Sequence, residues 1–380
     1  MTPRTVVYIS PSSRLLGARR SLLQLAANLD PARYRPVVIT KPKGDLVDAL
    51  KEAGVAVRPL FMGEWRKGRY LLSRPLKIAA IARIAREEGA ALIHCNEFHS
   101  NPYAVRAARR AGNPPVVTHM RLTITARQIR NYDLRRADRV LCVSQAAARD
   151  FEVWSDWRER VEVVYNGVDL REFKSSLSRQ EARNRLGLGA SHFVVGQFGL
   201  ISPRKRPHLL LNAAAILRED ASLRDRLRVL LVGSPGRSDT EYARELHEIV
   251  AREGLLDMVR FIPFTPGVVD LYRACDVNAL VSSEEGFGRT IIEAGALGIP
   301  SVGSRIGGIP ELIEDGQTGF LVAGEDDGAE LAERLRALDA VPGLCQEMGR
   351  TARTHVETHF SIQNHAQKIM EIYDRLLQST

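Results

Sequence analysis

The chain reads VNALVSSEEGFGRTIIEAGALGIP from Val277 to Pro300. The apolar run at its start, Val277 to Val281, predicts a buried strand, and the residues after Gly288 predict a helix. Between the two lies a glycine-rich loop that contains Gly286-Phe287-Gly288. Glycines let the backbone come close to a ligand, and the free N–H groups at the start of a helix bind phosphate oxygens. The stretch therefore predicts a strand, an anion-binding loop and a helix in direct succession.

The same alternation of strand and helix continues on both sides of this stretch. Short Val, Ile and Leu runs between helical patterns are typical of a parallel sheet that is covered on both faces. In the second half of the chain we expect strands at Phe193 to Phe198, Arg228 to Val232, Val259 to Ile262, Val277 to Val281, Ser301 to Val302 and Gly319 to Val322. In the first half we expect them at Val6 to Ile9, Arg35 to Thr40, Val55 to Pro59, Leu92 to Cys95, Val116 to His119, Arg139 to Ser144 and Val161 to Tyr165. The predicted fold class is α/β, with two doubly wound, Rossmann-like domains facing a cleft.

The pattern restarts after Asn166-Gly167-Val168-Asp169. An Asn-Gly turn followed by the polar stretch Lys174 to Arg185 is typical of a linker between two such arrays. We therefore expect domains at residues 1–167 and 168–360. A last helix, from about Ile362 to Leu377, has no strand after it, and we expect residues 361–380 to pack on the first domain.

Composition excludes several classes of protein. With 380 residues, 44% apolar and 26% charged, the chain is neither disordered, nor collagen-like, nor a coiled coil. It contains no run of ~18 apolar residues, and its start reads as a strand, so we expect a cytoplasmic protein. The cysteines at 95, 142, 275 and 345 are far apart without a C-x-x-C pair, which favours buried, reduced thiols over a zinc site or disulfides.

The positive charge belongs to the first half of the chain. Residues 1–165 contain 29 Lys and Arg against 15 Asp and Glu, a formal charge of +14, whereas the remainder contains 25 against 30. Such a surface suits an anionic lipid layer, a phosphorylated substrate or nucleic acid, and the sign alone does not choose among them.

Two segments of the second half contain residues that suit ligand chemistry. Glu285 in the glycine-rich loop and Glu293 in the following helix can address different parts of one ligand, because carboxylates hold sugar hydroxyls. Arg204, Lys205 and Arg206 follow Gly199 just past a strand, where cations would stabilise a departing diphosphate. For the glycine-rich loop, the alternative without a ligand is a turn with solvated glutamates. For the cluster of cations, it is a basic helix start exposed to water.

Together these segments resemble the retaining nucleotide-sugar glycosyltransferases of family 4, which have the two-domain GT-B fold. The resemblance covers nearly the whole chain, and its strongest part is the pair Glu285 and Glu293 with seven residues between them. Further matching motifs are Asn166-Gly167-Val168-Asp169, Gly307-Gly308-Ile309-Pro310-Glu311-Leu312-Ile313, Asp315-Gly316-Gln317-Thr318-Gly319, and Ala137-Asp138-Arg139-Val140 leading to Val143-Ser144.

The resemblance implies a role for each matching residue. It gives Glu293 the ribose hydroxyls, Glu285 the donor sugar hydroxyls and Lys205 the phosphates. The implied catalytic residues are His119, Lys205 and Glu285. The implied donor-binding residues are Gly17, Arg204, Lys205, Glu285, Gly286, Phe287, Gly288, Arg289, Thr290 and Glu293. In this family, retention is explained by front-side attack, in which the leaving phosphate oxygen takes the acceptor proton and no protein nucleophile is needed.

The chain departs from the family pattern at two positions. The family has Arg directly after the glycine that corresponds to Gly199, whereas this chain has Leu200, so Arg204 or Arg206 would have to substitute. The first glycine loop has paired glycines in the family, whereas here Leu16 precedes Gly17. Both departures bear on donor fit and on the rate of transfer.

We expect neither a metal nor a resident cofactor, with the nucleoside diphosphate sugar as co-substrate. His94, Glu97 and His99 are metal-ligand types, but their position at the end of a strand favours packing or cleft lining. The chain contains no D-x-D sequence, which the metal-dependent GT-A glycosyltransferases usually need. His119, at the end of its own strand, is by itself more typical of a buried core histidine than of a ligand contact, and it is the match to the family that favours the donor contact.

A second basic region predicts where the acceptor or a membrane would bind. Trp65, Arg66, Lys67 and Arg69 combine cations with aromatic and aliphatic neighbours, a mixture that suits a membrane interface. Arg127 and Arg130 would extend the patch. The plain alternative is the solvated face of a helix. We expect a sugar, lipid-linked or otherwise anionic acceptor, and association with the inner face of the cell membrane.

The predicted function is transfer of a sugar from a nucleoside diphosphate sugar, UDP- or GDP-linked, to an acceptor hydroxyl of a glycolipid or polysaccharide precursor. Alternatives are another GT-B enzyme, such as an epimerase or phosphorylase, and a catalytically decayed nucleotide-sugar-binding protein. Nucleic acid is not an expected partner, because no recognition motif accompanies the charge. A dinucleotide-dependent oxidoreductase is disfavoured because the first loop lacks G-x-G-x-x-G.

Overall fold

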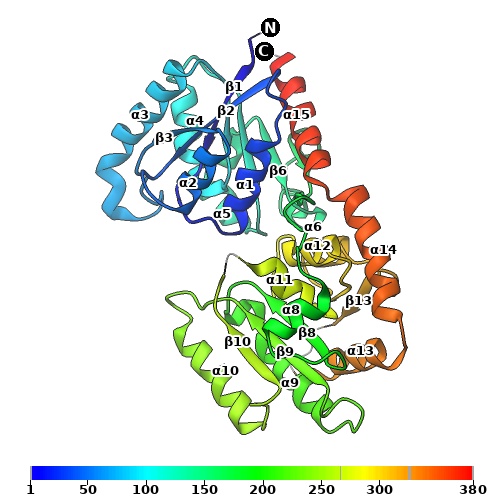
Figure 1. Ribbon diagram of the computed structural model, residues 1–380. Helices are drawn as coiled ribbons and strands as arrows, with labels where there is room; N and C mark the ends of the chain where they lie inside the picture. The colour runs from blue at the N-terminus through cyan, green and yellow to red at the C-terminus, as the bar shows by residue number, and fades with distance from the viewer. Residues whose placement is uncertain (1, 266, 324–326, 379–380) are drawn as a thin grey trace. The chain divides into compact units, whose positions relative to one another are not determined.

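The computed structural model describes residues 2–265, 267–323 and 327–378. The chain forms two compact units (Figure 1). Unit 1 comprises residues 1–167 together with residues 361–380, and unit 2 comprises residues 168–360. The chain therefore leaves unit 1 once and returns to it at its end. Within the described residues, no helix combines the length and the apolar character that crossing a lipid bilayer requires.

Unit 1 is built on one parallel sheet with the strand order β3-β2-β1-β4-β5-β6-β7. Its central strands are buried along nearly their whole length, because helices cover both faces of the sheet. The register places Tyr8 between Val38 of β2 and His94 of β4. The strands are β1 (Arg4–Ile9), β2 (Tyr34–Thr40), β3 (Ala56–Pro59), β4 (Ala90–Cys95), β5 (Val116–Met120), β6 (Arg139–Cys142) and β7 (Val161–Val163).

The larger helices of unit 1 form two layers, one on each face of the sheet (Figure 1). Helices α1, α2 and α15 pack on one face, and α3 and α4 pack on the other. Their bounds are α1 (Gly17–Ala27), α2 (Asp45–Glu52), α3 (Arg74–Glu87), α4 (Asn101–Ala108) and α15 (Ile362–Gln378). Shorter helices are η1 (Gly68–Ser73), η2 (Phe98–Ser100), α5 (Ala126–Asn131), η3 (Leu134–Arg136), α6 (Gln145–Arg149) and α7 (Trp157–Arg160).

Helix α15 is bound to the sheet of unit 1 by polar contacts as well as by its apolar face. The Tyr373 hydroxyl lies 3.0 Å from the Tyr8 hydroxyl and is hydrogen-bonded to Nδ1 of His94. The Tyr34 hydroxyl donates to the Asp374 carboxylate at 2.6 Å. Since Tyr8, His94 and Tyr373 are fully buried, these bonds satisfy polar groups that would otherwise be costly to bury. The last helix therefore completes the core of unit 1.

Unit 2 repeats the design with a six-stranded parallel sheet of order β10-β9-β8-β11-β12-β13. The strands are β8 (Phe193–Phe198), β9 (Leu227–Val232), β10 (Val259–Ile262), β11 (Val277–Leu280), β12 (Ser301–Ser304) and β13 (Gly319–Val322). Its helices are α8 (Arg179–Arg185), η4 (Pro203–Lys205), α9 (Pro207–Arg218), α10 (Thr240–Arg252), α11 (Val268–Ala274), α12 (Arg289–Ala296), η5 (Ile309–Glu311), α13 (Ala329–Ala340) and α14 (Leu344–His359). The predicted α/β class is confirmed, and each predicted strand is present with ends that differ by a few residues.

The predicted linker from Lys174 to Arg185 is wrong. Its second half forms α8, which packs on α11 inside unit 2. The side chain of Arg183 is buried and donates to the Asp276 carboxylate at 2.5 Å, and Ser178 with Glu181 forms a capping box at the helix start. The polar character of the stretch reflects a buried ion pair and a helix cap, which composition alone does not distinguish from a solvated linker.

The topology of unit 2 decides where its two sequence motifs meet. Strands β8 and β11 are neighbours at the centre of the sheet, and the strand order runs outward from them in opposite directions. In open parallel sheets, ligands bind outside the carboxyl ends of the strands at such a switch point. The loops after β8 and β11 are the two that contain Lys205 and Glu285. Both motifs therefore lie at the position that the fold favours for a ligand.

Candidate active site

The loop after β8 forms the first part of the candidate site. At its start, a Cβ atom added to Gly233 of the neighbouring loop would lie 1.7 Å from the Gly199 carbonyl oxygen, so only glycine permits this approach. The chain then forms η4, and Pro207 begins α9. The Gln197 side chain donates to the Lys205 carbonyl oxygen at 2.8 Å. These contacts fix the backbone from which the Lys205 side chain extends.

Lys205 and Glu285 form an ion pair across the two loops. Nζ of Lys205 bonds Oε2 of Glu285, and the two side chains are only 14% and 12% exposed. A single charge at this depth would be costly to remove from water, and the pair places two opposite charges in contact. The pair presents a cation and a carboxylate side by side at the switch point. A cation of this kind can meet a phosphate, and a carboxylate can accept hydrogen bonds from hydroxyls.

Backbone contacts hold the loop that contains Glu285 on both sides. The N–H of Ser283 donates to the Arg204 carbonyl oxygen at 2.9 Å, which joins the two loops directly. On the other side, the N–H of Gly308 donates to the Glu285 carbonyl oxygen at 3.1 Å. A Cβ atom on Gly307 would lie 1.8 Å from that same oxygen. The glycine pair thus explains why this motif accompanies Glu285 in the sequence.

Helix α12 begins at the site with several unsatisfied hydrogen-bonding groups. Gly288 precedes it with a φ of +108°, no side chain caps the helix, and its first turn contains no acidic residue. The first N–H groups of a helix have no acceptor within the helix. Nearby, the hydroxyls of Ser202 and Thr290 are buried and have no hydrogen-bond partner among the described residues. Since buried polar groups are normally bonded, these groups indicate a site for a polar ligand.

Glu293 lies one turn inside α12 and is held from two sides. The Tyr272 hydroxyl donates to its Oε2 at 3.2 Å, and the Arg289 guanidinium lies 3.3 Å from its Oε1. The Tyr272 ring is stacked on Phe198, with 3.6 Å between the ring centroids. Glu293 itself is 8% exposed. A carboxylate fixed in this way keeps lone pairs for a ligand hydroxyl without rotating freely.

The comparisons with known proteins identify the family of the chain. Residues 16–172 match the model of Glycosyltransferase Family 4, and residues 178–355 match that of Glycosyl transferases group 1. The chain is 33% identical, over 399 aligned positions, to a D-inositol 3-phosphate glycosyltransferase of Streptomyces avermitilis, with 98% of this chain and 83% of the relative covered. The protein belongs to glycosyltransferase family 4.

Further matches to this glycosyltransferase include a curated relative that covers about half of the chain and two solved structures that cover nearly all of it. A D-inositol 3-phosphate glycosyltransferase of Streptomyces bingchenggensis is 40% identical over 202 residues, and this match covers 52% of the chain and 44% of the relative. The crystal structure of Anabaena HepE in complex with UDP has a TM-score of 0.85 at 26% identity and covers 98% of this chain and 100% of that one. HepE in complex with UDP-glucose gives 0.84 at 27% identity, covering 98% and 99%. The two Rossmann-like units are those of the GT-B fold.

The residues predicted for the donor in unit 2 of the glycosyltransferase lie on the two loops and on α12. Phe287 is 3% exposed and its ring contacts Phe360, so it is a core residue that shapes the loop. The Arg204 guanidinium donates to the Glu284 carbonyl oxygen at 2.9 Å, and the residue is half-buried. Leu200, which stands where the family has Arg, is 44% exposed. The structure thus brings the predicted residues together, and their contact with a donor stays a prediction.

In unit 1, the predicted donor residues occupy the carboxyl ends of β1 and β5. Gly17 begins α1 directly after the β1 loop, and no atom lies within 4 Å of where its Cβ would be. His119 is fully buried on β5, and neither of its ring nitrogens has a hydrogen-bond partner among the described residues. Its ring is stacked on that of His94, with 5.5 Å between the centroids. Because the ring is 0% exposed, the structure itself shows no surface of His119 for a ligand, and the predicted contact with the donor stays a prediction.

Burial keeps both histidines neutral. It lowers the pKa of His94 and of His119 well below 6.5, and the positive charge of Arg121 lowers both further. A neutral imidazole can donate from one nitrogen and accept at the other, whereas an imidazolium can only donate. The stacked pair therefore keeps both hydrogen-bonding modes at neutral pH.

We expect unit 1 to lose stability as pH falls below about 6.5. In the unfolded chain each histidine takes up a proton near this pH, whereas in the folded chain His94 and His119 do not. The free energy of unfolding should therefore fall by up to about 1.4 kcal/mol per pH unit for each histidine. The three tryptophans, Trp65, Trp154 and Trp157, all belong to unit 1, so their fluorescence in urea titrations from pH 7.5 to 5.5 follows this unit alone.

The matched variants for this pH experiment are His119→Gln and His359→Gln. The first removes one buried titrating group and should flatten the pH dependence, whereas the second changes an exposed histidine of unit 2 and should leave it as in the wild type. A pH dependence that is the same in His119→Gln as in the wild type would contradict the assignment.

The structure adds two residues that motif analysis does not single out. The Arg121 guanidinium bonds both the carbonyl and the side-chain oxygen of Asn96 and donates to Oδ1 of Asn166 at 2.8 Å. It therefore ties the end of β5 to the loop after β4 and to the Asn-Gly turn. Its position two residues after His119 is the sequence signal that could have found it. Tyr272, the partner of Glu293, has no such signal, because 21 residues separate the two.

The residues that looked like metal ligands are engaged in other contacts. His94 bonds Tyr373, Glu97 forms an ion pair with Arg19 at 3.1 Å, and the His99 ring contacts Phe98. The part of the chain that the structure describes contains no group of three or more His, Cys, Asp or Glu side chains placed to hold a metal ion. All four cysteines are free thiols.

The predicted acceptor or membrane patch divides into two kinds of residue. Trp65 is partly buried, packs edge-on against Tyr103, and lies under the guanidinium of Arg74, 4.4 Å from its ring centroid. It is therefore a packing residue and does not project into solvent as an anchor would. Arg66, Lys67, Arg69, Arg127 and Arg130 are exposed.

Proposed function

We propose that this glycosyltransferase moves a sugar from a nucleoside diphosphate sugar to a hydroxyl of an anionic acceptor, with retention of configuration at the anomeric carbon. Unit 2 binds the donor, and the basic unit 1 binds the acceptor. The observation that carries the proposal is the buried Lys205–Glu285 pair beside the uncapped start of α12. This arrangement offers a cation and free N–H groups to a diphosphate and a carboxylate to the sugar hydroxyls.

The proposed mechanism uses the protein to stabilise charge and not as a nucleophile. The acceptor oxygen bonds to the anomeric carbon on the face from which the diphosphate leaves, and the bond from that carbon to the phosphate oxygen breaks. The acceptor proton passes to the departing phosphate oxygen. Lys205 and the N–H groups at the start of α12 stabilise the negative charge that develops there, where one well-placed donor is worth ~10²–10³ in rate.

The remaining residues position the donor in this proposal. Glu285 accepts hydrogen bonds from the sugar hydroxyls and Glu293 from the ribose. His119, whose two nitrogens are unsatisfied, contacts the sugar from unit 1. HepE of Anabaena, crystallised with UDP and with UDP-glucose, supports a nucleotide-sugar donor and favours UDP as the first nucleotide to test.

The acceptor is proposed to carry negative charge. Residues 1–165 have a formal charge of +14, and a surface of this sign raises the local concentration of anions. The Streptomyces relatives are named for an inositol phosphate, which is an anionic polyol. A lipid-linked acceptor at the inner face of an anionic membrane has the same chemistry, and peripheral association with that surface is part of the proposal.

The test of the function is a transfer assay with purified full chain. UDP-, GDP- and ADP-linked sugars are each offered with inositol phosphate or with an anionic glycolipid, and the anomeric proton of the product is followed by NMR. We expect one donor to give a product with the anomeric configuration of the donor, at a rate that EDTA does not change. An inverted product, loss of activity with EDTA, epimerised nucleotide sugar, or sugar phosphate released by inorganic phosphate would each overturn part of the proposal.

A further inference from the structure

Four large apolar side chains are exposed within sixteen residues of unit 1. Leu72 is 92% exposed, Leu76 72%, Leu71 55% and Phe61 46%. They lie along the segment that leads through η1 into the first turn of α3. Exposed apolar residues scattered singly need no explanation, but a group of this kind marks an interaction surface. We call Phe61, Leu71, Leu72 and Leu76 the leucine surface.

Tyr70 holds the segment that contains Leu71 and Leu72. The Tyr70 ring fills the space over Gly63, where an added Cβ atom would lie 2.2 Å from the ring, and it contacts Phe61 edge-on. Tyr70 thus anchors η1, in which no residue is buried. The two residues that follow it, Leu71 and Leu72, extend into solvent.

Helix α3 keeps Leu76 on the face that does not contact the sheet. Its buried residues are Ile78, Ile81, Ala82, Ile84 and Ala85, which cover the β-sheet on the face opposite to α15 (Figure 1). Leu76 lies outside this set and continues the leucine surface onto the start of the helix. The apolar face of α3 therefore packs in the core of unit 1, and the leucine surface is a separate, exposed set of side chains.

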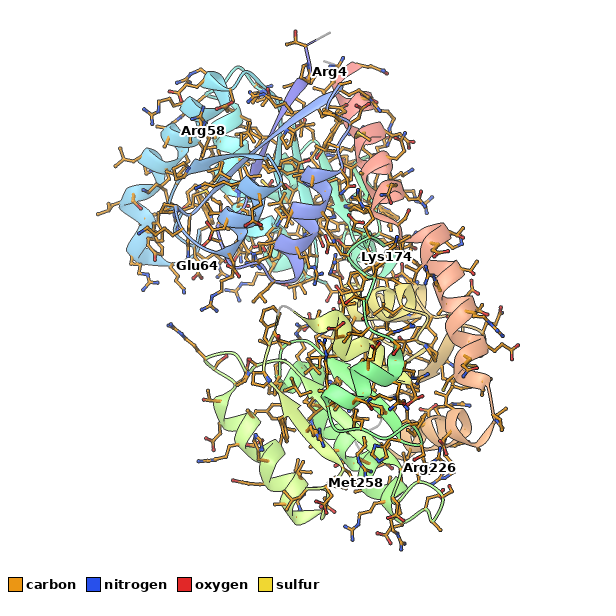
Figure 2. The ribbon with its side chains drawn as sticks, viewed as in Figure 1. Arg4, Arg58, Glu64, Lys174, Arg226 and Met258 are labelled. Carbon is orange, nitrogen blue, oxygen red and sulfur yellow. The ribbon has the colours of Figure 1, made fainter. Side chains whose placement is uncertain are left out.

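The charge around the leucine surface is almost wholly positive. Between residues 60 and 77 the chain has five cations, Arg66, Lys67, Arg69, Arg74 and Lys77, and one acid, Glu64. Glu64, labelled in Figure 2, is paired with Lys67 at 2.6 Å. Arg66 and Arg69 are exposed, and Arg69 lies over the Tyr70 ring, 4.9 Å from its centroid. Apolar tips surrounded by cations match the interface of a bilayer that contains anionic lipid.

We propose that the leucine surface and its surrounding cations dock unit 1 onto an anionic lipid bilayer. The leucines enter the boundary between headgroups and acyl chains, and the cations contact lipid phosphates. A second copy of the chain fits less well, because pairing two such surfaces would place the five cations of one copy opposite the five cations of the other, and like charges repel. This inference deepens the peripheral location in the proposed function. The docking is tested without donor or acceptor, so failure of the docking proposal can be told from failure of the proposed sugar transfer.

The test is sedimentation of the full chain with vesicles of phosphatidylcholine alone or with 30 mol% phosphatidylglycerol, a composition chosen so that anionic lipid is about a third of the surface. We expect at least tenfold tighter binding to the anionic vesicles and weaker binding as salt screens the charges. The variant Leu72→Asp with Leu76→Asp should lose at least tenfold in affinity. Its matched control, Val153→Asp with Leu256→Asp, changes two apolar residues that are 68% and 70% exposed elsewhere, and should bind as the wild type does.

Three outcomes would overturn the docking proposal. Binding that the Leu72 and Leu76 variant retains in full would mean that charge alone attracts the vesicles. Absence of binding to any vesicle would exclude a bilayer as the occupant. Concentration-dependent dimers that this variant abolishes would assign the surface to a second copy of the chain. Thermal shifts with UDP, measured on the same variants, report donor binding separately and should be unchanged.

Discussion

We expect Lys205→Ala to lower kcat/KM for sugar transfer at least tenfold, and by ~10²–10³ if Lys205 is the main donor to the leaving phosphate. The reason is that its ammonium is held beside Glu285 in a nearly dry site, where a charge interacts more strongly than in water. Transfer is measured with saturating and with limiting donor. An interaction made mainly in the transition state lowers kcat, whereas one made equally with the bound donor raises KM.

Two controls separate chemistry from folding in this experiment. Lys174→Ala removes an exposed lysine of unit 2, labelled in Figure 2, and should leave kcat/KM unchanged. Lys205→Ala also leaves Glu285 buried without its partner, which destabilises the protein. The double variant Lys205→Met with Glu285→Leu removes both charges, so it should recover thermal stability while transfer stays low. Full transfer by Lys205→Ala would remove this residue from the site.

We expect Glu293→Ala to abolish the thermal shift that a bound nucleotide produces. A ligand at about 100 times its dissociation constant stabilises the folded state by ~2.7 kcal/mol, which raises the melting temperature by a few degrees in a protein of this size. The variant loses the fixed carboxylate that Tyr272 and Arg289 hold in place. Melting curves are recorded with UDP, GDP, ADP and NAD.

The matched variants for the nucleotide shift are Glu241→Ala and Tyr272→Phe. Glu241 is an exposed glutamate of α10, and its loss should leave the shift intact. Tyr272→Phe keeps the ring that stacks on Phe198 but removes the hydroxyl that holds Glu293, so an intermediate shift is expected. A full shift in Glu293→Ala, or a shift with NAD alone, would contradict the assignment of the donor site.

The fold was predictable from sequence because its determinants are local. Most strands of both sheets contain a short apolar run, which predicts a buried strand. The alternation of these runs with helices predicts a parallel sheet. The exception was the stretch from Lys174 to Arg185. There Arg183 meets an acid, Asp276, that lies 93 residues away in the chain, and no local pattern contains that information.

The candidate site was predictable only in part for the same reason. Lys205 and Glu285 belong to motifs that strand ends bring together, so their meeting follows from the topology. That the two form an ion pair, and that Tyr272 and Arg121 hold their neighbours, depends on side-chain packing across the sheet. The acceptor or membrane patch was predicted to include Trp65, whereas that ring packs against Tyr103 and the exposed apolar side chains of the region include Leu72 and Leu76.

The return of α15 to unit 1 determines the order in which the protein can fold during its synthesis. Domains usually fold as they emerge, the N-terminal one first. Here the whole of unit 2 is synthesised before residue 361 is added to the chain. Until then, the face of the first sheet that contains Tyr8 has no helix α15 to cover it, and the buried hydroxyl of Tyr8 lacks its partner. The unit that is synthesised first is therefore completed last. A chain that ended before residue 361 would contain all residues of unit 2, whereas the core of unit 1 would lack the apolar residues that α15 contributes.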